Sequence, residues 1–178
     1  MGFQTTINTL LNLGVIGDIV LDEPHRIEML TLDGSGGTMG YGFTKSETTG
    51  IATVGGTIAA ATPFAGIACL PKQLPAFGSS ATNPLAPGLT LQPNSQVSML
   101  TFGSLIVNIG NAYNVGDQVV MTTATGVLGS IAYGGTPAGG TIAIPNCIVR
   151  GYPGQAAAMA ANATVGGGLA IIRLSTVY

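Results

Sequence analysis

Hydrophobic and polar positions alternate most clearly in the second half of the chain. The side chains of Val97 and Met99 fall on one side of an extended segment, and those of Leu100 and Phe102 fall on the other. Four further segments alternate in the same way and are separated by glycine-rich stretches. The pattern therefore predicts strands at residues 97–106, 118–123, 127–133, 141–149 and 169–177.

The turn residues divide these segments into short elements. Ala124-Thr125-Gly126 predicts a hairpin turn, and Asp33-Gly34 predicts the end of a strand at residues 27–32. A looser alternation predicts one more strand at residues 51–61. The alanine-rich segment 155–163 is the one candidate helix, because three glycines follow it. Many short strands with glycine-rich turns predict a mainly β domain, a sandwich or a barrel, with at most one short helix.

The segment 71–93 interrupts this pattern and carries half of the ten prolines. Proline donates no ladder hydrogen bond and keeps its predecessor extended, so we expect a long loop there. Such a loop is either functional or an inert connection. The apolar lead-in predicts an extended N-terminal arm at residues 1–20, followed by a single β-rich domain at 21–178.

Charge is scarce and unevenly placed. The chain has seven acidic and five basic residues, a net charge of −2, 28 glycines and 46% hydrophobic residues. Nucleic-acid binding is excluded because it needs a basic patch, and disorder is excluded because it needs high charge with few apolar residues. Residues 48–178 hold only Lys72, Asp117, Arg150 and Arg173. Either this is a β protein that happens to be uncharged, or much of its surface is buried in an assembly.

Signals for membranes, export and disulfides are weak. The longest apolar stretches are broken by glycine and proline, so we expect no membrane span. No basic residue precedes Arg26, so we expect no signal peptide. Cys69 and Cys147 lack the spacing of a disulfide framework or a zinc site, and we expect both to be buried free thiols in a reducing compartment.

The ionisable residues give little support for catalysis. Asp18, Asp22, Glu23, His25 and Glu28 cluster in sequence and could serve as an acid–base or divalent-ion site, but a solvated polar turn explains them better. The glycines at 34–42 followed by a lysine lack the spacing of a phosphate-binding loop. We expect no enzyme activity, no cofactor and no metal.

Several short motifs occur in the order found in a known family. Gly14-Val15-Ile16-Gly17-Asp18, then Glu23-Pro24-His25-Arg26, resemble the start of the capsid cement, or decoration, proteins of tailed bacteriophages. Val115-Gly116-Asp117-Gln118-Val119, followed by Ala124-Thr125-Gly126, resembles a later segment, and residues 168–174 resemble the closing strand. His25 departs from the family pattern, in which arginine often follows proline directly, and the proline-rich loop has no match.

The resemblance implies a jelly-roll-like or barrel-like antiparallel β domain that binds the outer surface of a capsid as a symmetric homotrimer or homodimer. It implies bridging of major capsid protein subunits, assembly in the host cytoplasm, and no nucleic acid or membrane partner. We expect the arm to lie over neighbouring subunits, although it could instead form a first strand of the protein's own core. The expected interface residues are Phe3, Ile7, Leu10, Leu11, Leu13, Asp18 and Arg26. The alternative function is a head-fibre or tail adhesin for host recognition.

Overall fold

The computed structural model describes residues 15–20, 23–70, 90–151 and 165–175, and the described part is built from β-strands without a helix. The mainly β prediction is confirmed, while the candidate helix at 155–163 lies outside the described residues. The strands, in chain order, are β1 (Arg26–Thr31), β2 (Gly37–Thr38), β3 (Gly42–Lys45), β4 (Ala52–Val54), β5 (Phe64–Ala68), β6 (Thr90–Leu91), β7 (Gln96–Tyr113), β8 (Gln118–Thr122), β9 (Leu128–Ile131), β10 (Thr141–Gly151) and β11 (Val165–Leu174).

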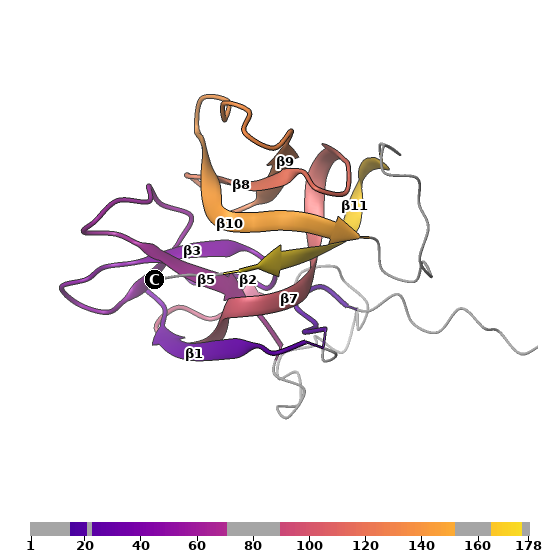
Figure 1. Cartoon of the computed structure of the whole chain (residues 1–178). Coiled ribbons are helices and arrows are strands. Elements are labelled where there is room, and N and C mark those ends of the chain that lie inside the picture. Colours follow the sequence, from indigo (N-terminus) through magenta and orange to yellow (C-terminus); the bar gives the residue numbers. More distant parts are fainter. Residues whose placement is uncertain (1–14, 21–22, 71–89, 152–164, 176–178) are drawn as a thin grey trace, which may run out of the picture.

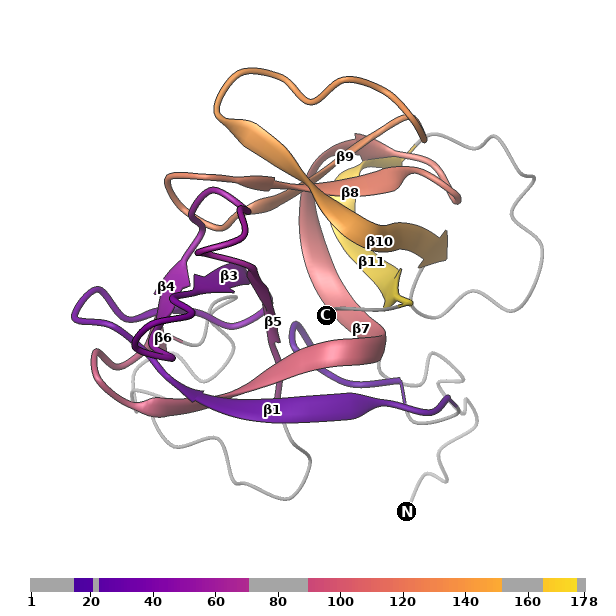
Figure 2. The same cartoon turned by 60° about the vertical axis from the view of Figure 1, so that its left-hand side comes forward.

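The long strand β7 belongs to both halves of the molecule. Its pairing partners are all antiparallel: β1 and β5 along its first part, and β11 along the rest. The sheet runs in the order β4-β3-β5-β7-β11-β10-β8-β9 and curls on itself, with β1 attached to β7. We call β1, β3, β4, β5 and the first part of β7 the first lobe, and β8 to β11 with the last part of β7 the second lobe. Figures 1 and 2 show β7 passing from one lobe into the other.

Gly103 marks the bend between the two parts of β7. Its φ of 118° lies in the region that favours glycine, and the β1 ladder shifts register nearby, where Arg26 pairs with Phe102 but Ile27 pairs with Leu100. An extra residue in a strand reverses which side chains face inward. The bend therefore lets one strand contribute to both lobes, as its curvature in Figure 2 illustrates.

Two hydrophobic cores follow from this arrangement. The larger core lies mainly in the second lobe and includes Leu105, Val107, Ile109, Tyr113, Val119, Met121, Leu128, Ile144, Cys147, Val149 and Ile172. The smaller core lies mainly in the first lobe and includes Leu30, Leu32, Met39, Phe43, Ala52, Ala65, Ala68, Val97 and Met99, together with Leu91 of β6. The polar end of buried Tyr113 is satisfied, since its hydroxyl donates to the carbonyl oxygen of Leu169 at 2.5 Å.

The predicted strand at 51–61 is wrong over most of its length. Only Ala52–Val54 is a strand, and it ends where Gly55 and Gly56 take φ values of 70° and 91°. A side chain at Gly55 would collide with the carbonyl oxygen of Thr123, 2.5 Å from the position of its Cβ. Glycine is needed at this turn because the backbone of the β8–β9 hairpin leaves no room for a side chain.

Most of the predicted proline-rich loop lies outside the described residues. Its last part is described, and there Thr90–Leu91 forms β6 and pairs with β2. The division into an arm at 1–20 and a domain at 21–178 stays a prediction. In the described part of that arm, Ile19 forms an antiparallel bridge with Leu105 of β7. β1 is antiparallel to β7 as well.

Candidate binding surface

The first motif of the resemblance forms a tight turn at residues 15–18. The amide of Asp18 donates to the carbonyl oxygen of Val15 at 2.9 Å, and the amide of Val15 donates to Oδ2 of Asp18 at 3.2 Å. Gly17 occupies the third position with a φ of 93°, as a type II turn requires there. The carboxylate of Asp18, predicted as an interface residue, therefore stabilises its own turn.

The second Gly-Asp motif forms the same turn at residues 114–117. The amide of Asp117 donates to the carbonyl oxygen of Asn114 at 3.2 Å, and the amide of Asn114 donates to Oδ2 of Asp117 at 2.8 Å. Gly116 has a φ of 95°. Both motifs thus have the same local explanation: glycine supplies the positive φ, and aspartate caps the first amide of the turn.

The turn at 15–18 leads into a segment that is fixed to β7. The amide of Gly17 donates to the carbonyl oxygen of Ile106 at 2.8 Å, and the amide of Val20 donates to that of Ser104 at 2.9 Å. Gly17 also accepts a hydrogen bond from the amide of Leu70 at 2.8 Å. The described end of the N-terminal segment is therefore held between the bend of β7 and the end of β5.

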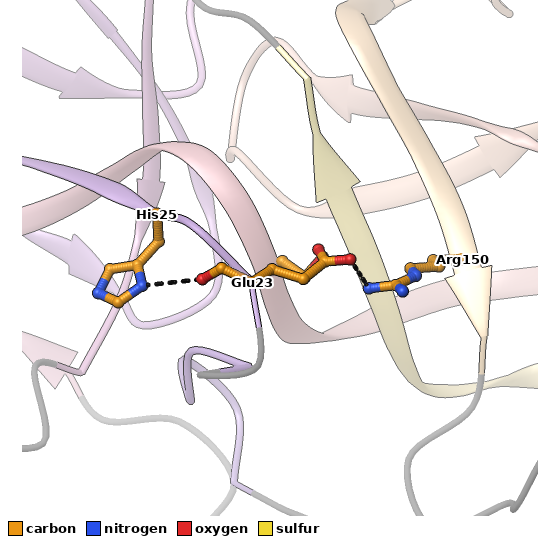
Figure 3. A network of polar contacts seen from close by, with 4 residues as sticks. Glu23, His25 and Arg150 are labelled. Atoms are coloured by element: carbon orange, nitrogen blue, oxygen red, sulfur yellow. Dashed lines mark hydrogen bonds and ion pairs between the residues drawn. The ribbon is translucent and has the colours of Figure 1, made fainter.

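Glu23 is the centre of a polar cluster at the bend of β7. Its Oε2 accepts a hydrogen bond from the hydroxyl of Ser104 at 2.6 Å, and its Oε1 forms an ion pair with Arg150 at the end of β10. On the other side, Nδ1 of His25 lies 3.3 Å from the carbonyl oxygen of Glu23. Figure 3 shows Glu23 between His25 and Arg150. The cluster connects the N-terminal segment to both β7 and β10.

The surroundings of Glu23 favour its charged form. The hydrogen bond from Ser104 is the main cause that lowers the pKa of the Glu23 carboxyl, and the positive charges of Arg150 and Arg173 lower it further against an opposing effect of burial. The Glu23 side chain is 16% exposed and that of Arg150 is 43% exposed. The pair lies at the surface, so we assign it a positioning role rather than a large share of stability.

Arg26, the other described interface candidate, begins β1 with its side chain exposed. Its carbonyl oxygen accepts a hydrogen bond from the hydroxyl of Thr101 at 3.2 Å, and its guanidinium forms no ion pair with the described part of the chain. The charge of Arg26 is therefore open to solvent in this structure. The other predicted interface residues, Phe3, Ile7, Leu10, Leu11 and Leu13, lie outside the described residues.

The described residues offer no grouping suited to metal binding. Among them, no three His, Cys, Asp or Glu side chains converge on one point. Cys69 and Cys147 are buried and free, as predicted, and burial raises the pKa of Cys69 to about 12 and that of Cys147 as well. Both thiols are therefore held in their unreactive protonated form at neutral pH. In the described ranges, no helix is long and apolar enough to span a membrane.

Sequence analysis missed two surface features. Arg150 was not paired with Glu23, because no local signal links positions so far apart in the sequence. The second feature is Tyr133, which is 78% exposed in the connection between β9 and β10. The predicted strand at 127–133 includes Tyr133, whereas β9 ends at Ile131. The large hydrophobic residues exposed in the described structure are Val15, Met29, Ile51, Val115 and Tyr133.

Comparisons with known proteins agree with these observations. The model of a phage family described as structural cement protein (E217 gp24/Pam3 gp6) matches residues 3–175. Among solved structures, a chain from the capsid of the Myoviridae phage XM1 has a similar fold, with a TM-score of 0.63, 17% identity and 100% of each chain covered. No match was found among curated proteins.

Proposed function

The chain belongs to the phage structural cement protein family, and from this premise we propose that it binds the outer surface of a phage capsid as a symmetric oligomer and bridges neighbouring major capsid protein subunits. It is a capsid-associated structural protein of the virion. The match of the family model to residues 3–175 is the observation that carries the proposal. The family is structural, and we infer that the chain acts by binding rather than by catalysis.

The distribution of charge supports a role in an assembly. Beyond residue 48 the described residues include three charged ones, Asp117, Arg150 and Arg173, and Arg150 is paired with Glu23. A charge buried in an interface needs a partner that replaces its lost hydration, whereas uncharged groups need at most a hydrogen bond. A body with so few charges loses little solvation free energy when a shell or a second copy covers it.

Several weak contacts can together hold such a protein on a shell. Burial of apolar surface contributes about 25 cal/mol per Å², from which the cost of association is subtracted. Once one subunit of an oligomer has bound, its partners are held at a high local concentration next to their own sites. We infer a homotrimer or a homodimer, in which each subunit adds a modest contact and the oligomer bridges capsomers.

The N-terminal segment is the proposed contact with neighbouring subunits. Its described part is bonded to β7 and to Leu70, and the Glu23–Arg150 ion pair holds the chain that follows it. This anchoring supports an arm whose starting point is fixed on the body. The proposed contact residues are Phe3, Ile7, Leu10, Leu11, Leu13, Asp18 and Arg26. We infer that neither nucleic acid nor a membrane takes part.

The test is the number and position of copies on purified particles. We expect a copy number that scales with the number of capsomers, and density for the protein on the outer surface across capsomer boundaries. Mass spectrometry of the particles gives the first quantity and a cryo-EM reconstruction gives the second. A few copies confined to one vertex or to the tail would contradict the proposal and would favour an adhesin.

A further inference from the structure

The two lobes are joined at a second place besides β7. The amide of Gly42, at the start of β3, donates to the carbonyl oxygen of Gly126 in the β8–β9 turn at 2.9 Å. The amide of Gly56, just after β4, donates to the carbonyl oxygen of Thr123 at 2.7 Å. We call these four residues, together with Gly55, the clasp. Figure 2 shows β3 and β4 of the first lobe near the β8–β9 part of the second lobe.

The clasp joins strands from opposite sides of β7. In the order of the sheet, β5 separates β3 from β7, while β11 and β10 separate β8 from β7. A connection through β7 alone would let the lobes swing at Gly103, where that strand bends. A second connection remote from the first removes this freedom.

Glycine is required on both sides of the clasp. At Gly126, whose φ is 73°, an added Cβ would lie 2.6 Å from the carbonyl oxygen of Gly42 and 3.0 Å from the amide nitrogen of Gly55. At Gly55, whose φ is 70°, it would lie 2.9 Å from the amide nitrogen of Gly126. The backbones of the two lobes therefore touch with no side chain between them.

Each half of the clasp is fixed within its own lobe. The hydroxyl of Thr44, a buried residue of β3, donates to the carbonyl oxygen of Gly55 at 2.8 Å. In the second lobe, the amide of Gly126 donates to the carbonyl oxygen of Thr122 at 2.8 Å. Since neither half can follow the other lobe, a change in the angle between the lobes must break the clasp.

We propose that the clasp is a conformational lock that keeps the two lobes at one fixed angle, with Gly55 and Gly126 as its positioning residues. Its role rests on the proposed function, because a protein that bridges two capsid subunits holds them at a set distance only if its own lobes keep their angle. When the clasp opens, the bend at Gly103 becomes a hinge. The larger core, to which Phe64 of β5 contributes, limits how far the lobes then swing.

The experiment measures the distance between the lobes in the purified full chain. Spin labels are attached to cysteines introduced by Met29→Cys on β1 and Tyr133→Cys after β9, at positions that are 54% and 78% exposed, while the natural cysteines are buried. The labelled protein is compared with the same protein carrying Gly126→Ala or Gly116→Ala. Gly116 is the matched control, because it has a φ of 95° in a tight turn but an added Cβ there meets nothing within 4 Å.

Only the clasp variant should change the distance between the lobes. We expect Gly126→Ala to widen the distribution of label distances about twofold or more, and Gly116→Ala to leave it unchanged. Hydrogen exchange at the amides of Gly42 and Gly56 should become about tenfold faster or more in Gly126→Ala alone. Both measurements are made below the unfolding transition, so that a general loss of stability does not widen the distribution. An unchanged distribution in Gly126→Ala, or an equal widening in Gly116→Ala, would overturn the inference.

A second pair of variants tests the lock if Gly126→Ala does not fold. Thr44→Val removes the hydrogen bond to Gly55 and should widen the distribution to a smaller extent. Thr62→Val removes a similar bond, from its hydroxyl to the carbonyl oxygen of Thr57 at 2.7 Å, and should leave the distribution unchanged. The same response from both threonine variants would count against the lock.

Particles separate the lock from the proposed function. At equal occupancy, the Gly126→Ala protein should raise the temperature at which particles break open by less than the natural protein does. An equal rise would show that bridging does not need the lock. No rise with the natural protein would instead overturn the proposed function, while the distances between the lobes would still test the lock.

Discussion

The side chain of Asn111 on β7 takes the place of a strand residue opposite Ser130 on β9. Its Nδ2 donates to the carbonyl oxygen of Ser130 at 2.9 Å, while its Oδ1 accepts from the amide of Ser130 at 2.9 Å. The hydroxyl of Ser130 donates to the carbonyl oxygen of Ala112 at 3.1 Å. β9 otherwise pairs only with β8 among the described strands. The side-chain hydrogen bonds of Asn111 and Ser130 therefore close the second lobe into a barrel-like unit.

Replacing Asn111 should open this closure. In Asn111→Ala the amide and carbonyl of Ser130 lose their partners, and we expect the free energy of unfolding to fall by about 1–3 kcal/mol. Asn108→Ala, at an exposed position of the same strand, is the control and should change it by less than about 0.5 kcal/mol. Chemical denaturation measures both values. Equal values for the two variants would show that Asn111 does not stabilise the closure.

The bend of β7 predicts that Gly103 and Gly110, two glycines of this strand, differ in how much an alanine substitution lowers stability. At Gly103, an added Cβ would lie 2.8 Å from Cβ of His25 and 3.1 Å from its Cα, and the φ of 118° is unfavourable for any other residue. Gly103→Ala should therefore cost about 2 kcal/mol or more in unfolding free energy.

The matched control for Gly103 is Gly110→Ala. An added Cβ at Gly110 meets its nearest neighbour, the carbonyl oxygen of Leu128, at an ordinary 3.6 Å, so we expect little effect. Thermal and chemical unfolding of both variants give the comparison. A tolerant Gly103 together with a sensitive Gly110 would mean that the contact with the Pro24-His25 segment does not determine the bend.

The sequence predicted those elements whose signals are local. The Ala-Thr-Gly turn follows from the φ preference of glycine, and the Asp33 turn is closed by a hydrogen bond from the amide of Ser35 to Oδ1 of Asp33 at 2.9 Å. In contrast, β5 was missed because all five of its residues are buried. A strand buried on both faces shows no alternation.

The remaining errors come from contacts between distant parts of the chain. β7 continues to Tyr113 past exposed Asn108 and Asn111, which in sequence resemble the end of a strand. The register shift between β1 and β7 at this bend also cannot be seen in a period-two pattern, because it lies where His25 packs closely against Gly103. The Glu23–Arg150 ion pair joins β10 to the N-terminal segment and has no sequence signal at all.

Stability should depend on pH through Glu23. The pKa of its carboxyl is lowered in the folded protein from an ordinary value of 4.5, mainly by the hydrogen bond from Ser104. The charged form is therefore stabilised by folding. This contribution is complete above the unfolded pKa and is lost as the pH falls through the folded pKa.

The test of this dependence is a comparison of two glutamine variants. Glu23→Gln should flatten the loss of stability below about pH 5, whereas Glu47→Gln, at an exposed position without an ion pair to the described residues, should leave it unchanged. Unfolding temperatures measured across the acidic range provide the data. If both variants keep the slope of the natural protein, Glu23 is not its source.

Binding to capsids should be nearly insensitive to salt. Salt screens exposed charges over a distance of about 8 Å at physiological ionic strength, and the proposed contact residues are apolar apart from Asp18 and Arg26. We expect the dissociation constant to change by less than about threefold when salt is raised from about 0.05 to about 0.5 M. Arg26→Gln should remove most of the remaining salt dependence of binding. A steep loss of binding at high salt would contradict a mainly apolar contact.

The proposed arm makes the last prediction. Deletion of residues 2–13 should abolish binding to capsids and leave the unfolding temperature of the body unchanged, because the described body has its own two cores. A variant with serine at the apolar positions Leu10, Leu11 and Leu13 should behave like the deletion. The control carries serine at the polar positions Thr5 and Thr6 and should bind normally. Particle occupancy and thermal unfolding are measured together. A fall in unfolding temperature would place the segment in the protein's own core. Unchanged occupancy would show that the segment makes no capsid contact.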